Sequence, residues 1–126
     1  MCDVMTECAD AGHIDCIALL AGMLYNGSGG CPQDIAAGGQ RAVAAGHGGS
    51  VDGACLLASM IADGRAFTRR AEQALKWAHV CNMNGGAESA IAAVQNLRQD
   101  VTPEEDDAAR SFALQWRRMR QSDLAG

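Results

Sequence analysis

Small and apolar residues recur along the chain at a helical interval, and that pattern itself repeats every 37 residues. In each copy a small residue is followed by apolar residues four and seven positions later, which places all three on one face of an α-helix. The stripes are Cys16, Leu20 and Met23, then Gly53, Leu57 and Met60, then Ala90, Val94 and Leu97. Three copies in register predict a helical unit that is used three times.

Glycines mark the limits of these stripes. Gly12, Gly49 and Gly86 precede them at the same 37-residue step, and Gly27 and Gly64 follow the first two. A glycine just after the last apolar residue is a common helix stop, because a left-handed backbone costs glycine little. The sequence therefore predicts that the first helix of each of these two units ends at its glycine.

A second stripe predicts a second helix in each unit. Its clearest copy leaves Lys76 and His79 off the apolar face and consists of Ala74, Trp77, Val80 and Cys81. A step back of 37 residues gives a weaker stripe at Ala37, Gln40, Val43 and Ala44. Gly38 and Gly39 interrupt it, and each costs on the order of 1 kcal/mol relative to alanine inside a helix. We therefore expect this helix to be short or frayed at its start.

The C-terminal segment predicts a further helix over residues 102–121. Thr102 is placed to cap its N-terminus, Pro103 suits the first helical position, and Glu105 completes a capping box. Acidic residues lie near the positive end of the helix dipole, and arginines lie near the negative end. The expected apolar face consists of Ala109, Phe112, Ala113, Trp116 and Met119.

Together these elements predict an all-α fold. A pair of helices that cannot bury its apolar faces alone must stack on neighbouring pairs. We expect an α/α solenoid, or superhelix, of about two and a half helix-turn-helix repeats of ~37 residues, closed by a C-terminal capping helix at 102–121. The expected units span about 9–46, 46–83 and 83–120 within a single domain, 1–126.

Composition and charge narrow the classes of partner. Apolar residues make up 48% of the chain and charged residues 20%, as in folded globular proteins. The net charge is −5, of which residues 1–64 carry −6 and the rest +1. An acidic half does not attract phosphate backbones, so nucleic acid is not expected as a partner. There is no apolar run of the length of a membrane span and no signal peptide, so we expect a cytoplasmic protein.

The repeated unit resembles the Sel-one-like repeat family, whose members are related to the tetratricopeptide repeat. The segments "CIALLAGMLYNGSGG", "DIAA", "GACLLASMIADG" and "ALKWAHVCNMNGGAESA" match its pattern, and the closing "TPEE…A…W" resembles the end helix of many bacterial members. Departures are Gln40 in place of a tryptophan, Asp34 one residue late, and a second loop without its glycine and aspartate. The resemblance implies an α/α solenoid that binds other proteins.

The residues themselves give no sign of catalysis, and we expect no enzyme, no cofactor and no metal site. The six cysteines and three histidines lack the paired spacing of zinc ligands. We interpret Cys55 and Cys81 as small apolar core residues, because free cysteine is among the most buried residue types. The pair Cys8 and Cys16 has a spacing that a cysteine-rich branch of the resembled family uses for a disulfide. Both a disulfide and two reduced thiols stay open, since a reducing cytoplasm would keep the thiols free.

The outer side of the first helix in each unit supplies a candidate binding groove. If the stripes face the core, these positions form one ladder of small, apolar and acidic side chains. Its members are Asp15, Leu19, Gly22, Asn26, Asp52, Leu56, Ser59, Asp63, Ser89 and Asn96. Such a groove suits a helix or extended segment that carries basic and apolar residues. The alternative is that these positions are simply solvated.

The most direct interpretation is a protein–protein interaction module that acts as an adaptor, a scaffold or a small accessory subunit of a larger assembly. A second hypothesis is a cysteine-based redox or metal-handling assembly factor that uses Cys8, Cys16 and neighbouring cysteines. Thiol counting on the native protein, together with metal analysis, separates the two hypotheses, because six free thiols and no bound metal would remove the second.

Overall fold

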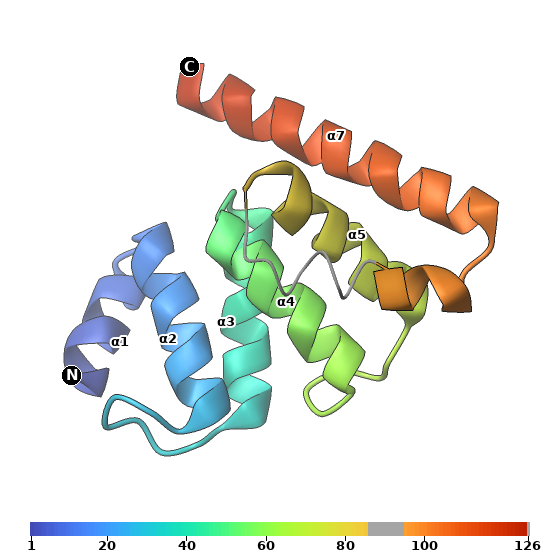
Figure 1. Cartoon of the computed structure of the whole chain (residues 1–126). Coiled ribbons are helices and arrows are strands. Elements are labelled where there is room, and N and C mark those ends of the chain that lie inside the picture. The colour runs from blue at the N-terminus through green and yellow to red at the C-terminus, as the bar shows by residue number, and fades with distance from the viewer. Residues whose placement is uncertain (86–94, 126) are drawn as a thin grey trace.

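In a computed structural model, the chain is built from helices joined by short connections (Figure 1). The structure describes residues 1–85 and 95–125, and this part contains helices and turns but no strand. The all-α prediction is therefore confirmed for the described residues. Within them, no helix combines the length and the apolar character that crossing a membrane requires.

The helices follow one another in antiparallel pairs along the chain. α1 spans Cys2–Asp10, α2 Ile14–Asn26, α3 Ile35–His47, α4 Val51–Asp63 and α5 Ala71–Met83. A short 3-10 helix, η1 (Arg98–Asp100), precedes the long α7 (Pro103–Ala125). In Figure 1, α1, α2 and α3 lie side by side, and α4 and α5 follow. α7 packs against α5 and runs across the top of the view.

α2 and α4 have equal length and equivalent ends. Each has 13 residues, and both their first and their last residues lie 37 positions apart. Each ends on a glycine in the left-handed conformation, Gly27 with φ 69° and Gly64 with φ 77°. Both predicted helix stops are confirmed.

α3 differs from its prediction. It is a full helix of 13 residues that begins at Ile35, where the Asp34 side chain caps it by accepting from the Ala37 amide. Gly38 and Gly39 are buried inside it and do not fray it. At Gly38 a β-carbon would lie 2.8 Å from the Tyr25 backbone nitrogen, so the glycine lets α3 approach α2 closely. This close contact offsets the low helix propensity of glycine.

The 37-residue step also fails for the second helix of each pair. α5 begins 36 residues after α3, because the connection before α3 is one residue longer than the one before α5. In α3, accordingly, the expected stripe residues Gln40 and Ala44 are exposed. The buried positions of α3 are Gly38, Gly39, Ala42, Ala45 and Gly46.

The described members of the predicted first-helix stripes mostly face the interior. Leu20, Leu57, Met60 and Leu97 are at most 3% exposed, while Met23 is half-buried. Leu57, Met60 and Leu97 belong to the main core between α2 and α7, whereas Leu20 belongs to a smaller core between α1 and α2. Gly53 is buried and Cys16 is half-buried, and the other two stripe residues, Ala90 and Val94, lie outside the described residues.

α5 is buried on more sides than its stripe predicts. Ala74, Trp77, Val80 and Cys81 are all in the core, as expected. The expectation that His79 lies off the buried face is wrong, because His79 is only 4% exposed and its Nε2 lies 2.8 Å from Asp106 Oδ1 in α7. α7 packs along α5, which covers a position that would be solvated in an isolated helix pair.

The capping box at the start of α7 is confirmed. Glu105 donates its amide to Thr102 Oγ1 at 3.1 Å, and the Glu105 carboxylate accepts from the Thr102 amide at 2.9 Å. Ala109, Ala113 and Trp116 are buried as predicted, and Phe112 is half-buried. The expectation that Met119 lies on the buried face is wrong, since 68% of Met119 is exposed.

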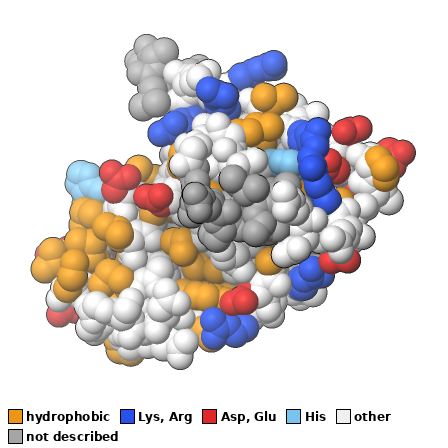
Figure 2. All heavy atoms as spheres, viewed as in Figure 1, with side chains coloured by type: hydrophobic (Ala, Val, Ile, Leu, Met, Phe, Trp, Pro, Cys, Tyr) orange, Lys and Arg blue, Asp and Glu red, His pale blue; other side chains and the backbone are white. Residues whose placement is uncertain are grey.

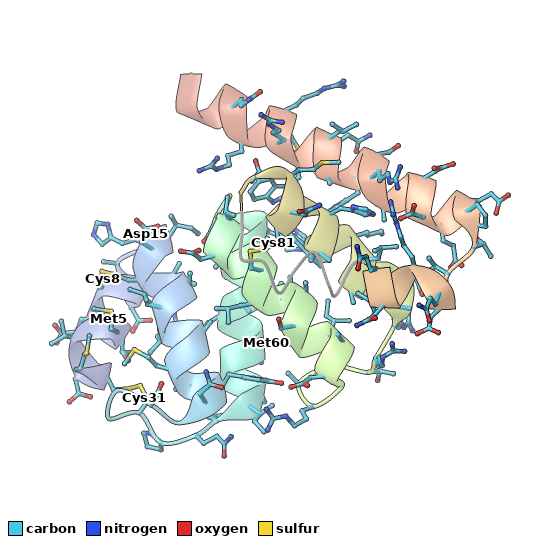
Figure 3. The ribbon with its side chains drawn as sticks, viewed as in Figure 1. Met5, Cys8, Asp15, Cys31, Met60 and Cys81 are labelled. Carbon is cyan, nitrogen blue, oxygen red and sulfur yellow. A yellow bond between two sulfur atoms is a disulfide. The ribbon has the colours of Figure 1, made fainter. Side chains whose placement is uncertain are left out.

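Three disulfides take up all six cysteines (Figure 3). Cys8 is bonded to Cys16 across the turn between α1 and α2, and Cys2 is bonded to Cys31 in the α2–α3 connection. Cys81 is buried as expected and Cys55 is half-buried, but neither is a free cysteine, because they join α4 to α5 in a disulfide with their Cα atoms 4.9 Å apart. Their separation of 26 residues follows no cysteine motif.

Candidate functional site

Four of the predicted groove residues line one hollow between α2 and α4. Leu19 and Gly22 come from α2, and Asp52 and Leu56 come from the facing part of α4. The hollow measures about 290 Å³, and Ala18, Met23 and Ser28 complete its lining. Leu19 is 58% exposed, so this apolar side chain is presented at the surface. We call this hollow the α2–α4 groove.

Acidic side chains extend the α2–α4 groove toward the α3–α4 connection. Asp15 and Asp52 line a second hollow of about 300 Å³, which also contains Arg120 and the Gly48–Ser50 turn. Both aspartates are exposed, and among the described residues neither has an ion-pair partner within 4.0 Å. Asp52 belongs to both hollows, so they adjoin. The result is an apolar floor with an acidic end.

The other predicted groove residues do not line these hollows. Asn26, Ser59 and Asn96 are exposed, and Ser89 lies outside the described residues. Asp63 is engaged elsewhere, because it accepts the Tyr25 hydroxyl at 2.5 Å and pairs with Arg65 at 3.4 Å. The hydrogen bond from Tyr25 holds the pKa of Asp63 below its ordinary value, with a smaller effect from Arg65. Desolvation and this same bond raise the pKa of Tyr25.

A second surface was not predicted from the sequence. Four of the five aromatic residues of the chain line two hollows that share His47. Phe67 and Trp77 line the larger hollow, of about 320 Å³, and Phe112 and Trp116 line the smaller one, of about 130 Å³. We call this surface, made by α3, α5, α7 and the α4–α5 connection, the aromatic belt.

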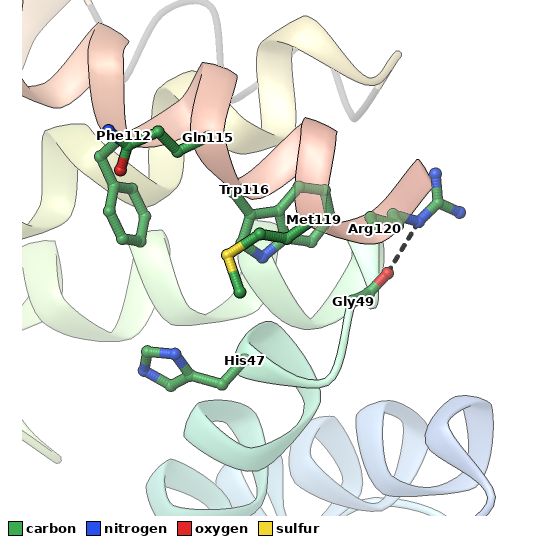
Figure 4. Close-up of a pocket in the computed structure, with 7 residues that line it drawn as sticks. All are labelled: His47, Gly49, Phe112, Gln115, Trp116, Met119 and Arg120. Carbon is green, nitrogen blue, oxygen red and sulfur yellow. Dashed lines mark hydrogen bonds between the residues drawn. The ribbon is translucent and has the colours of Figure 1, made fainter. Parts of the chain in front are cut away.

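Contacts between rings and backbone fix the geometry of the aromatic belt. The Trp77 ring meets the rings of His47 and Phe112 edge-on, with centroids 5.0 and 5.2 Å away. Trp116 donates from Nε1 to the Gly46 carbonyl at 2.7 Å. Figure 4 shows Met119 pointing from α7 toward His47, and Arg120 donating to the Gly49 carbonyl.

The sequence carried only indirect signs of the aromatic belt. His47 and Trp116 are 69 positions apart, and no local spacing brings them together. Trp77, Phe112 and Trp116 lie at helical core positions, where packing is the simplest interpretation of an aromatic residue. Their partly open arrangement depends on how α7 crosses the ends of α3 and α5.

The described side chains do not assemble a metal site. Among residues 1–85 and 95–121, no three His, Cys, Asp or Glu side chains lie close enough together to hold an ion. All six cysteine sulfur atoms are in disulfides, so none is a thiolate, which is the form that binds metals.

No protein-family model matches the chain, and no curated protein matches its sequence. The relationship to the Sel-one-like repeats therefore stays a prediction that rests on the residues themselves.

Proposed function

We propose that the chain is a protein-interaction module of the Sel-one-like repeat type, serving as an adaptor, scaffold or accessory subunit. In this proposal its helix pairs form an α/α solenoid, and the α2–α4 groove receives a helix or extended segment that carries basic and apolar residues. The observation that supports this most directly is the convergence of Leu19, Gly22, Asp52 and Leu56 on one hollow.

The chemistry of the groove is the reason for the proposed partner. An apolar side chain of the partner would pack on Leu19 and Leu56, and a basic one would pair with Asp15 or Asp52. Grooves between helices commonly accept amphipathic segments in this way. The equal lengths and glycine ends of α2 and α4 support the repeat assignment.

The three disulfides bear on the location and on the redox alternative. Disulfides persist in oxidising compartments and are rare where glutathione keeps thiols reduced. We therefore propose an oxidising compartment in place of the expected cytoplasm. A redox or metal-handling role for Cys8 and Cys16 would first require their disulfide to be reduced, and no observation favours that function.

Affinity capture from source lysate tests the groove. The wild-type chain is expected to retain specific proteins, identified by mass spectrometry, that the Leu19→Asp, Leu56→Asp double variant loses. An added acid in a desolvated apolar contact is expected to weaken binding by at least about tenfold. Helix content by circular dichroism should be unchanged, because neither leucine is fully buried.

Leu114→Asp provides the matched control. Leu114 is an exposed leucine on α7, away from the residues that line the groove. This variant should capture the same proteins as the wild type. Full capture by the Leu19, Leu56 variant would place the binding face elsewhere.

A further inference from the structure

The aromatic belt combines apolar rings with positive charge. Arg70 lines its larger hollow and Arg120 its smaller one. Lys76 Nζ lies 5.5 Å from the centroid of the Phe112 ring. None of the described residues that line either hollow is acidic. Aromatic residues, methionine and arginine are enriched in protein interfaces.

Side chains at the mouths of both hollows of the belt are exposed. Met119 is 68% exposed at the mouth of the smaller hollow, and Arg70 is exposed at the larger one. Trp77 itself is only 4% exposed, so the rings form the floor of the surface and not its rim. A partner for this surface would need apolar side chains together with acidic ones.

The outer face of α1 has the opposite charge. Asp3, Val4 and Glu7 are all exposed, and the helical spacing puts them on the face turned away from Ala9 and Met5. Val4 is 62% exposed, which is high for a β-branched apolar residue on a short helix. Among the described residues, neither Asp3 nor Glu7 has an ion-pair partner within 4.0 Å.

α1 also presents this face rigidly. One disulfide holds each end of the helix, through Cys2 and through Cys8. A preorganised helix loses little conformational freedom when it docks, which favours binding. Figure 2 shows apolar side chains gathered over α1 and α2, while basic ones gather over the α7 side.

We propose that the aromatic belt is the docking surface for α1 of a second copy of this chain. Val4 enters the belt, while Asp3 and Glu7 face Arg70, Lys76 and Arg120. The contact joins two different surfaces, so it is head-to-tail, and the pair as a whole keeps one free α1 and one free belt. The belt adjoins the acidic end of the α2–α4 groove at Gly49 and Arg120, whereas the apolar part of the groove, at Leu19 and Leu56, shares no lining residue with the belt.

Sedimentation velocity of the oxidised full chain tests this assembly. Because α1 has only 9 residues, we expect a small interface and a weak association. The sedimentation coefficient should therefore rise over about 5 to 500 µM. An α1 variant (Asp3→Asn, Val4→Asn, Glu7→Gln) and a belt variant (Arg70→Gln, Lys76→Gln, Met119→Asn) should each lose association by at least about tenfold.

A mixture of the two variants gives the decisive result. The α1 variant keeps its belt and the belt variant keeps its α1, so together they should form a 1:1 dimer and nothing larger. A face-to-face contact between identical surfaces would not be restored by mixing, and failure to restore the dimer overturns the proposal.

Two matched controls should associate as the wild type does. One changes the apolar part of the α2–α4 groove (Leu19→Asn), and the other changes the outer side of α7 (Leu114→Asn, Arg117→Gln, Arg118→Gln). The proposal is wrong if the wild type sediments as a monomer at every concentration, or if either control loses association as strongly as the test variants. A monomeric wild type does not bear on partner capture by the groove, so the failure of this proposal can be told apart from the failure of the proposed function.

Discussion

At the scale of single residues, glycines set how closely the helices approach. A β-carbon on Gly38 would lie 2.8 Å from the Tyr25 nitrogen and 3.0 Å from the Ala21 carbonyl oxygen. Both atoms belong to the α2 backbone, which cannot move away as a flexible side chain can. Sequence reasoning treats Gly38 as a helix breaker, because propensity is a local property and helix packing is not.

Gly38→Ala is therefore expected to lower the free energy of unfolding by about 1–3 kcal/mol, since the added methyl group forces α2 and α3 apart. Gly22→Ala is the control, because its β-carbon would meet only the Leu56 side chain, with Cδ1 at 3.8 Å and Cδ2 at 4.0 Å. That variant should be neutral or more stable by up to about 1 kcal/mol. Urea unfolding measures both, and equal effects would contradict the close-packing explanation.

The bond between Tyr25 and Asp63 makes a second residue-scale prediction. A carboxyl group whose pKa is lowered on folding stabilises the fold above its unfolded pKa, and this contribution is lost as the pH falls through the folded pKa. Tyr25→Phe removes the hydroxyl and should raise the pKa of Asp63 toward its ordinary value, as followed by NMR titration.

Stability should follow the same window. The difference in unfolding free energy between wild type and Tyr25→Phe should shrink as the pH falls from about 6 to below about 3. Arg65→Gln is the control, and it should raise the pKa of Asp63 by less, because Arg65 contributes less to the shift. An Asp63 pKa that is the same in wild type and Tyr25→Phe would refute this assignment.

At the scale of elements, we expect the two disulfides of α1 to stabilise its position more than its packing does. It contacts α2, and its core contribution is the small cluster around Ala9, Leu20 and Cys31. Two disulfides join it to the rest of the chain, with sequence separations of 29 and 8 residues. Disulfides of this kind stabilise a protein by about 2–4 kcal/mol each.

Replacing Cys2, Cys8, Cys16 and Cys31 by serine should therefore release α1 while the later helices stay folded. Hydrogen exchange is expected to speed up over residues 2–10 by at least about tenfold and to change little in α4 and α5. The Cys55→Ser, Cys81→Ser variant is the control, since its effect should lie in α4 and α5. Unchanged protection of α1 in the first variant would show that packing alone holds it.

Elements differ in how well the sequence predicts them. α2, α4 and the capping box of α7 follow from local signals, namely apolar spacing, glycine stops and the Thr102–Glu105 pair. The burial of His79 does not, because it depends on α7, whose Asp106 lies 27 positions away. The Cys55–Cys81 disulfide likewise joins two helices that no motif connects.

At the scale of the molecule, the predicted ladder along α2 and α4 contains four of the residues that line the α2–α4 groove. It missed the aromatic belt, because that surface exists only where α3, α5 and α7 meet. Residues at the core positions of one helix become the floor of a hollow where the next helix leaves them partly uncovered. The crossing of helices decides this, and periodicity does not encode it.

Counting thiols tests the proposed compartment. Native protein from its source, alkylated without reduction, should gain no mass, and after reduction and denaturation it should gain six alkyl groups. Recombinant protein made in a reducing cytoplasm is the comparison, and it should carry free thiols. Six alkyl groups on the unreduced native protein would favour the cytoplasmic location that the sequence predicts.

Both tryptophans belong to one end of the molecule, and this has a practical consequence. Trp77 and Trp116 report on the junction of α3, α5 and α7, through the ring contacts of one and the Gly46 hydrogen bond of the other. α1 and α2 contain no tryptophan. Indole emission is therefore blind to the first helix pair, while far-ultraviolet ellipticity records every helix, so two melting curves that separate would locate the first part to unfold.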